Sequence, residues 1–301
     1  MKKMKIIGII SALGAMEIIF LLFGAVSFSR TSYFKDHFEN FSAQKIELVI
    51  ILFLAMLASY SVLWICREGF ERMQKRVLIG SGIVFVATCV VIPPFLSRDI
   101  AAYLSETTTP YGPLFHGAMV PIVFFAQNKK LSDAQDAYKI INALLFIVSI
   151  CIVVRLTRLL SLPSATPYLY AYNPAILIQG VLEGHNDIWL ILCILLFLYA
   201  WIRKKYVHGS MFLMGSIAIK YISVILMPIL FIKNKKFTRN AYIVFLLFIA
   251  GMGYIAVSLL GFSFMNAFQR LFSQFLSPCL YACTPIISMI RSFFGKTSHG
   301  I

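Results

Sequence analysis

The stretch Ile6–Phe28 reads IIGIISALGAMEIIFLLFGAVSF, and three lysines stand just before it within Met1–Lys5. A helix of roughly 20 apolar residues crosses a bilayer, whereas the apolar part of a signal peptide has about 7–15 residues. The length of this run therefore predicts an uncleaved first membrane span, with the lysine-rich N-terminus in the cytoplasm.

The rest of the chain has the same apolar character. Of its 301 residues, 60% are hydrophobic and only 13% are charged, and the mean hydropathy is +0.85. A soluble domain is about half apolar and about a quarter charged, and a disordered chain is more polar still. The composition excludes both classes. It predicts an all-α integral membrane protein in which residues 1–301 form a single domain.

Further apolar runs predict a polytopic helical bundle of about nine spans in all. Two external segments, Pro113–Gln127 and Phe264–Leu276, are apolar or amphipathic but short, and we expect them to lie at the outer membrane surface. The predicted spans after the first are Ile46–Ile65, Val77–Leu96, Ile140–Val154, Tyr168–Leu182, Ile188–Ile202, Met211–Ile232, Tyr242–Gly261 and Cys279–Phe294.

The basic residues, Lys+Arg 27 against Asp+Glu 12, predict the orientation in the cell membrane. Such residues gather in cytoplasmic loops and near anionic lipids, and no basic helix with interleaved aromatics indicates nucleic-acid binding. With the basic loops inside, the segment Ser97–Lys139 and the turn Glu183–Asp187 fall outside. The residues placed inside are Lys2, Lys3, Lys5, Arg67, Arg72, Lys75, Arg76, Arg155, Arg158, Arg203, Lys204 and Lys205.

The run Met211–Ile232 conflicts with this alternation, because basic residues stand on both sides of it. Gly215 and Pro228 allow a broken helix, and broken helices at membrane depth usually line a cavity. We favour a broken helix with Lys220 near its tip over a complete span.

A first polar cluster, Ser97-Arg98-Asp99, follows two prolines that end the third predicted span. A short helix here places Asp99 and Tyr103 on one face, and a carboxylate against an apolar wall can act as a general base. The alternative is that Asp99 pairs with Arg98 or caps the helix.

A second cluster, Glu183-Gly184-His185-Asn186-Asp187, follows Tyr172-Asn173-Pro174 and fills a tight turn. Its spacing matches no metal motif, so we expect no metal. These groups suit hydroxyls and a phosphate, with Asp187 also capping the next helix.

A third candidate is Lys220-Tyr221, which lies inside an apolar run. A lysine there needs a partner, and a phosphate serves as well as a carboxylate. The alternative is that the Lys220 side chain extends to the nearby interface between membrane and water.

Read in order, these motifs resemble a known family. The strings S-R-D-x-x-x-Y, T-P-Y-G-P-L, Y-N-P, G-x-x-E-G-H-N-D and G-x-x-x-x-K-Y resemble the polyprenol-phosphate-sugar-dependent glycosyltransferases of the GT-C fold. The likeness is to the bacterial mannosyltransferase branch, and it extends from about Pro93 to Pro228.

The resemblance implies a hexosyltransferase, with mannose among the candidate sugars, that works on the outer face of the membrane without a cofactor. Its donor is a polyprenyl-phosphate sugar and its acceptor a glycan or a lipid. Asp99 would be the base, and displacement would be direct, with inversion. His185, Asn186 and Lys220 would contact the donor phosphate, and Tyr111-Gly112-Pro113 the acceptor. The full set expected to bind substrate is Arg98, Tyr103, Tyr111, Glu183, His185, Asn186, Asp187, Lys220 and Tyr221.

Two other functions stay open at this point. A transporter or lipid flippase could use Asp99, Asp187 and Lys220 as a relay, although it would be expected to show repeated halves. The second open function is that of a catalytically inactive membrane partner of a glycan assembly system.

Overall fold

The computed structural model describes residues 2–28, 43–73, 75–94, 99–105, 111–127, 131–227 and 247. Regular structure in these ranges is all helical, which confirms the fold class there. The α-helices are α1 (Lys2–Phe28), α2 (Ala43–Ile65), α3 (Lys75–Val91), α4 (Asp99–Ser105), α5 (Pro113–Gln127), α6 (Leu131–Leu159), α7 (Thr166–Ala171), α8 (Pro174–Ile176), α9 (Asp187–Ile202) and α10 (Tyr206–Ile219). Two 3₁₀ segments, η1 (Arg67–Arg72) and η3 (Tyr221–Leu226), and one π-helix, η2 (Leu177–Leu182), complete the set.

Three helices of the described part are long and apolar enough to cross a membrane: Lys3–Ala25, Glu47–Ile65 and Asp133–Leu159. Shorter apolar helices include Arg76–Val91, Asp187–Ile202 and Tyr206–Ile219. These helices support a helical membrane protein, while the total of nine spans stays a prediction.

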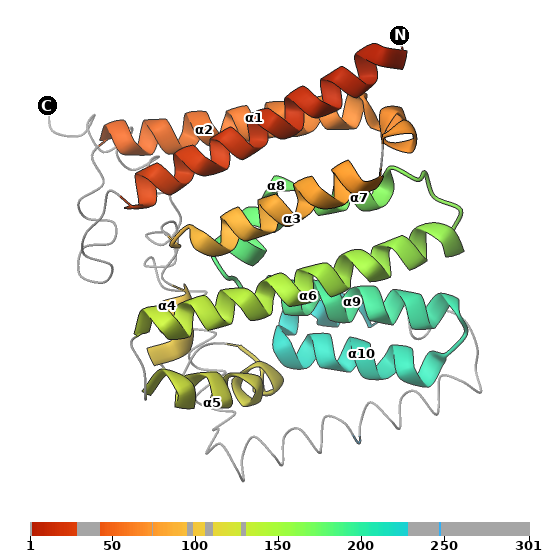
Figure 1. The fold of residues 1–301 in the computed structure, drawn as a ribbon. Helices are drawn as coiled ribbons and strands as arrows, with labels where there is room; N and C mark the ends of the chain where they lie inside the picture. The colour runs from red at the N-terminus through yellow and green to blue at the C-terminus, as the bar shows by residue number, and fades with distance from the viewer. Residues whose placement is uncertain are drawn as a thin grey trace, which may run out of the picture.

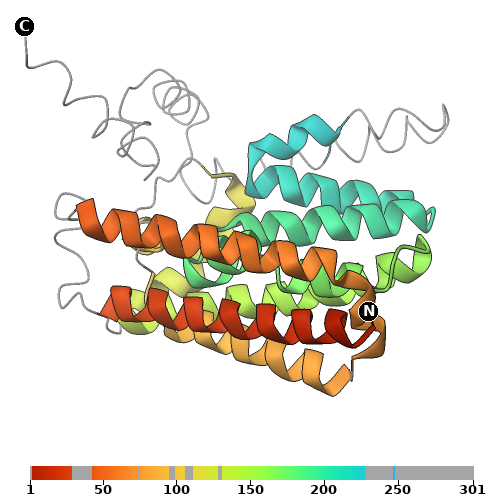
Figure 2. The same ribbon diagram turned by 90° about the horizontal axis from the view of Figure 1, so that it is seen from above.

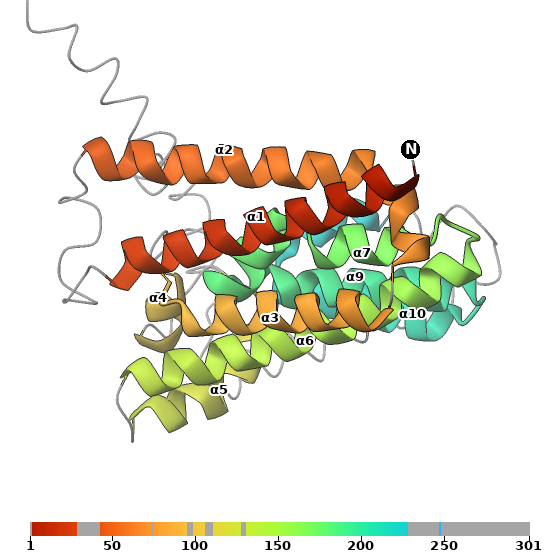
Figure 3. The same cartoon turned by 45° about the horizontal axis from the view of Figure 1, so that its top comes forward.

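The helices pack as a bundle with α6 near its middle (Figure 1). Helix α1 contacts α2 and α3, α3 contacts α6, and α6 contacts α9, which pairs with α10. The long helices run roughly along one direction when the bundle is seen from above (Figure 2). Helices α4 and α5 lie at the end of the bundle opposite the N-terminus (Figures 1 and 3).

The predicted span Tyr168–Leu182 is wrong as one continuous helix. Helix α7 ends at Ala171, and α8 begins only at Pro174. Asn173 is extended, and its side-chain oxygen accepts from the Ala175 amide at 2.9 Å. A proline disfavours the helical conformation of the residue before it, and Asn173 then caps the next helix, so the chain breaks here.

Helix α6 begins earlier than the sequence predicted, at Leu131 rather than Ile140. The segment Ser97–Lys139 is therefore not a simple external loop, because its last part belongs to the longest helix of the bundle. Because Gln135 and Lys139 are polar, the sequence did not indicate that the helix begins before them. In the structure both are buried on one side of α6. Helix α5, which precedes α6, spans Pro113–Gln127, and these are the bounds that the sequence predicted for this segment.

The predicted break within Met211–Ile232 is confirmed, and it falls at Lys220, the residue expected near the tip of the broken helix. Helix α10 continues through Gly215 and ends at Ile219, and Lys220 is extended, with φ −147° and ψ 118°. The 3₁₀ segment η3 follows at once. The interruption thus falls at the lysine itself. The segments Tyr242–Gly261, Phe264–Leu276 and Cys279–Phe294 lie outside the described residues.

Candidate active site

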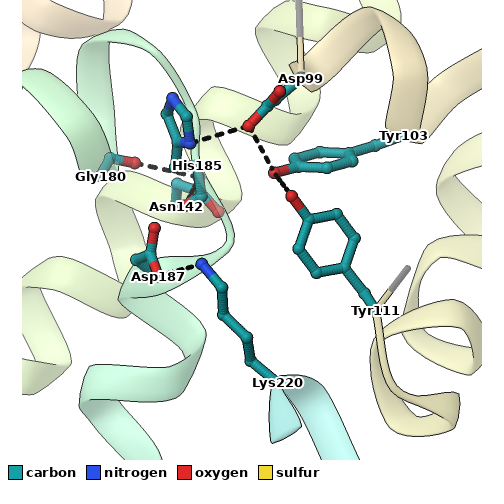
Figure 4. A network of polar contacts seen from close by, with 8 residues as sticks. All are labelled: Asp99, Tyr103, Tyr111, Asn142, Gly180, His185, Asp187 and Lys220. Atoms are coloured by element: carbon teal, nitrogen blue, oxygen red, sulfur yellow. Dashed lines mark hydrogen bonds and ion pairs between the residues drawn. The ribbon is translucent and has the colours of Figure 1, made fainter. Parts of the chain in front are cut away.

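The short helix α4 presents Asp99 and Tyr103 on one face, as the sequence predicted. Tyr103 Oη donates a hydrogen bond to Asp99 Oδ2 at 3.3 Å, and it lies 3.3 Å from Tyr111 Oη (Figure 4). The next residues along the helix, Ile100 and Leu104, face the protein core. Helix α4 is thus anchored by its apolar side and turns its polar side toward the site.

Both phenols beside Asp99 stay protonated. Burial, followed by the negative charge of Asp99, raises the pKa of Tyr103 well above its ordinary value. The same two causes raise the pKa of Tyr111 to about 12. Tyr103 and Tyr111 are therefore hydrogen-bond donors at any physiological pH.

The turn before α9 brings His185 to Asp99, although 85 residues of chain lie between them in sequence. His185 Nδ1 lies 2.9 Å from Asp99 Oδ2, with side chains 19% and 36% exposed. Gly184 has a φ of +63°, which favours glycine, and a Cβ there would lie 2.3 Å from Ile100 Cδ1. The turn can approach α4 this closely only because residue 184 has no side chain.

His185 holds its proton more tightly than an ordinary histidine. Burial by itself would lower its pKa, but the hydrogen bond and charge of Asp99, with the charges of Glu183 and Asp187, outweigh burial and raise it. The Asp99–His185 contact is therefore an ion pair over a wider pH range than two exposed groups would give.

A second pair joins Asp187 and Lys220 on the other side of the site (Figure 4). Lys220 Nζ donates to Asp187 Oδ1 at 2.6 Å, and both side chains are about one-third exposed, at 34% and 37%. Lys220 Nζ also lies 5.8 Å from the centre of the Tyr111 ring, a cation–π distance. One prediction is corrected here: Asp187 does not cap α9, whose N-cap residue is Asn186.

A backbone contact fixes the Tyr111 loop against the break after α10. The Gly112 amide donates to the Ile219 carbonyl at 2.9 Å. A Cβ on Gly112 would lie only 2.2 Å from the Ala218 carbonyl oxygen, so no larger residue fits. This contact holds Tyr111 beside Lys220 and links the two pairs.

The remaining predicted substrate-binding residues differ in their burial and in their contacts. Glu183 is 1% exposed and acts on the site through its charge. Asn186 is fully buried, and among the described residues neither the oxygen nor the nitrogen of its amide has a hydrogen-bond partner. Tyr221 begins η3 with its side chain exposed, and no contact in the described part joins it to either pair. Arg98 lies outside the described residues, as does Glu106, another carboxylate of the segment Ser97–Lys139 that could act as base.

Sequence reasoning missed Asn142 of α6. Its amide nitrogen donates to the Gly180 carbonyl at 3.0 Å and to the His185 carbonyl at 3.3 Å (Figure 4). Its amide oxygen accepts from Trp189 Nε1 at 2.8 Å. The available signal was a lone carboxamide in the apolar run IINALLFIVS, since polar groups at membrane depth are functional candidates.

In the ranges that the structure describes, no three His, Cys, Asp or Glu side chains come together in a way that could hold a metal ion. The site thus consists of one acid–imidazole pair, one acid–ammonium pair and two phenols. Such a set can hold hydroxyls, remove a proton and bind an anion.

Residues 105–234 match a mannosyltransferase family model. Its description is alpha-(1->6)-mannopyranosyltransferase, N-terminal domain, and the match covers less than half of the chain. It includes Tyr111, Asn142, His185, Asp187 and Lys220, but begins after Asp99 and Tyr103. The match supports a relation to mannosyltransferases and thus a glycosyltransferase activity. No curated protein and no solved structure matches the chain.

Proposed function

We propose that this protein is a membrane glycosyltransferase that moves a hexose, with mannose favoured, from a polyprenyl-phosphate donor to an acceptor hydroxyl. The reaction takes place at the outer face of the membrane and inverts the anomeric centre. The observation that carries the proposal is that Tyr111 lies near both charged groups. Its hydroxyl oxygen is 3.3 Å from that of Tyr103, which binds Asp99, and its ring centre is 5.8 Å from the ammonium nitrogen of Lys220.

The acidic side of the site suits the acceptor. Tyr111 is a donor that can hold the acceptor oxygen beside Asp99, while Tyr103 donates to the carboxylate itself. Asp99 takes the hydroxyl proton while that oxygen attacks the anomeric carbon. His185 orients the carboxylate through its 2.9 Å contact.

The basic side suits the leaving group. As the bond between the anomeric carbon and the phosphate oxygen breaks, the electron pair stays on the phosphate and its negative charge increases. An ammonium group then binds the phosphate more strongly in the transition state than in the ground state, which accelerates the transfer. Lys220 is partly exposed and can exchange the Asp187 carboxylate for this phosphate.

The decisive experiment supplies purified protein in liposomes with radiolabelled polyprenyl-phosphate mannose and a mixed glycan and lipid acceptor fraction. We expect donor consumption and a labelled product in the wild type, and strong loss of both in Asp99→Asn. Asp133→Asn, which changes an exposed carboxylate in the first turn of α6, is the matched control and should stay active.

The same experiment separates the competing functions. Movement of intact donor between the leaflets, with no sugar transferred, would establish a flippase instead. Wild-type protein that neither consumes nor moves polyprenyl-phosphate mannose or glucose would refute the proposal.

A further inference from the structure

One buried face of α6 carries two polar side chains that reach out of the helix. Lys139 and Asn142 lie three residues apart, on adjacent turns of the same face, and both are 0% exposed. A polar group in an apolar interior is costly unless it is hydrogen-bonded. Both side chains bind backbone carbonyl groups of other segments. Asn142 binds the turn that carries His185, and Lys139 binds Ile92, seven residues before Asp99 in the chain.

Lys139 holds the connection that leads to Asp99. Its ammonium group donates to the carbonyl of Ile92, which follows α3 and directly precedes Pro93 and Pro94. A cation is favoured at a helix C-terminus, where carbonyl groups lack intrahelical partners. The charge of Glu183, in the His185 turn, also acts on this ammonium group.

Asn142 holds the turn that carries His185. Its two amide hydrogens serve the carbonyls of Gly180 and His185, at 3.0 and 3.3 Å, on either side of the turn. The indole N–H of Trp189 donates to its oxygen at 2.8 Å, so the orientation of the amide is fixed by its partners. The Asn142 carboxamide therefore binds both ends of residues 180–185 (Figure 4), in addition to the amides of Glu183 and His185, which donate to the carbonyls of Ile178 and Gln179.

The Asp99–His185 contact joins two short segments, of which α4 is anchored by its apolar side and the turn by backbone bonds to Ile178 and Gln179, so further contacts to α6 add to a limited support. Helix α4 spans only Asp99–Ser105, and the turn contains a residue with positive φ. Without an outside anchor, both side chains could relax toward water, since both are partly exposed.

We propose that Lys139 and Asn142 are positioning residues, which hold the backbone on the two sides of the Asp99–His185 pair so that its side chains meet. The inference rests on the proposed function in one respect, namely that this pair belongs to the active site. The contact itself can be measured without any activity.

The experiment titrates His185 by NMR in full-length protein that carries isotope-labelled histidine, in detergent micelles. The chain has five histidines, and His185→Gln identifies the signal of interest. The variants are Asn142→Leu and Lys139→Met, which remove the polar group but keep the approximate volume. In both we expect the pKa of His185 to fall below its wild-type value, because the Asp99 contact that raises it is lost.

The sign of the change in the pKa of His185 distinguishes a positioning role from a direct effect of the Lys139 charge. Removal of a nearby positive charge in Lys139→Met would by itself raise the pKa of His185, whereas loss of the Asp99 contact lowers it. Ser149→Ala is the matched control. It removes another buried polar group of α6, one bound to Phe146 and Tyr170 away from the site, and should leave the titration unchanged.

An unchanged pKa of His185 in folded Asn142→Leu and Lys139→Met would overturn the inference. If either variant does not fold, Trp189→Phe decides, because it removes the donor that orients the Asn142 amide and keeps an aromatic ring beside Phe115 and Tyr138. Trp189→Phe should also lower the pKa of His185, by a smaller amount. An unchanged pKa would again overturn the inference. Sugar transfer, measured in parallel, bears on the proposed function separately.

Discussion

At the scale of single residues, the site depends on which groups bind the Asp99 carboxylate. His185 and Tyr103 both bind Oδ2, from a turn and from α4 itself. The alternative in which Asp99 merely caps its helix does not account for the His185 contact. A carboxylate held on one side by two donors can present a defined direction to an acceptor hydroxyl.

Asp99→Asn keeps the size and much of the hydrogen bonding but removes the base. We expect the transfer rate to fall on the order of a hundredfold or more, with donor binding retained. Initial rates and donor affinity of the purified variants check this. Glu106→Gln and Asp187→Asn are made in parallel. If one of these abolishes transfer while Asp99→Asn does not, the base is misassigned.

The raised pKa of His185 makes folding stability depend on pH. A group whose pKa is higher in the folded state stabilises that state fully below its unfolded pKa and loses this effect as pH rises through the folded pKa. The stabilisation by His185 should therefore be complete below pH 6.5, its ordinary value, and decline above it. Thermal unfolding of wild type and His185→Gln across this range gives the difference. A difference that grows with rising pH would contradict the assignment.

Substitutions of Lys220 and of its partner Asp187 should change the affinity for the donor in opposite directions. Lys220→Met removes the phosphate ligand and should weaken donor binding about tenfold, equal to about 1.4 kcal/mol. Asp187→Asn frees the ammonium group from its competing carboxylate, so donor binding should be equal to or stronger than that of wild type. Titration of both variants with polyprenyl-phosphate mannose checks this. Equal weakening in both would mean that the pair is structural only.

At the scale of elements, one close approach joins the Tyr111 loop to the end of α10. In Gly112→Ala the new methyl group would meet the Ala218 carbonyl, and the Gly112–Ile219 hydrogen bond would be strained. We expect destabilisation of about 1–3 kcal/mol, together with weaker donor binding because Lys220 moves away from Tyr111. Gly117→Ala is the control. Its Cβ meets nothing within 4 Å, so it should be neutral or add up to about 1 kcal/mol of stability.

The elements also show where sequence reasoning succeeds. The α4 face with Asp99 and Tyr103, and the bounds of α5, follow from local periodicity and from prolines, so they were predictable. The Asp99–His185 and Asp187–Lys220 pairs join distant segments, and only tertiary packing decides them. The start of α6 was missed because Gln135 and Lys139 read as exposed polar residues, whereas Lys139 is buried with a carbonyl partner.

At the scale of the whole molecule, the site and the N-terminus lie at opposite ends of the bundle (Figures 1 and 3). This arrangement agrees with a cytoplasmic N-terminus and an outer active site, as the basic loops predict. The side of the membrane on which each end lies remains a prediction.

Cysteine labelling in intact cells tests the topology. In a background without the native cysteines, Thr108→Cys and Asp133→Cys should react with an impermeant reagent, and Lys204→Cys should react only after permeabilisation. Asn186 is unsuitable as a probe because it is fully buried. Protection of the first two positions together with labelling of the third would reverse the topology and exclude an outer active site.

Asn142 binds the carbonyl groups of Gly180 and His185 and none of the side chains of that turn. Asn142 thus recognises the main chain of this segment, whereas the close approach to α4 still requires glycine at position 184. For protein engineering, substitutions belong at exposed positions that flank the turn, because residues 180–184 and Asn186 are buried and His185 contacts Asp99. Gln179, which is exposed, is the natural first position to randomise in a search for altered sugar preference, since its replacement leaves the grip on the backbone intact.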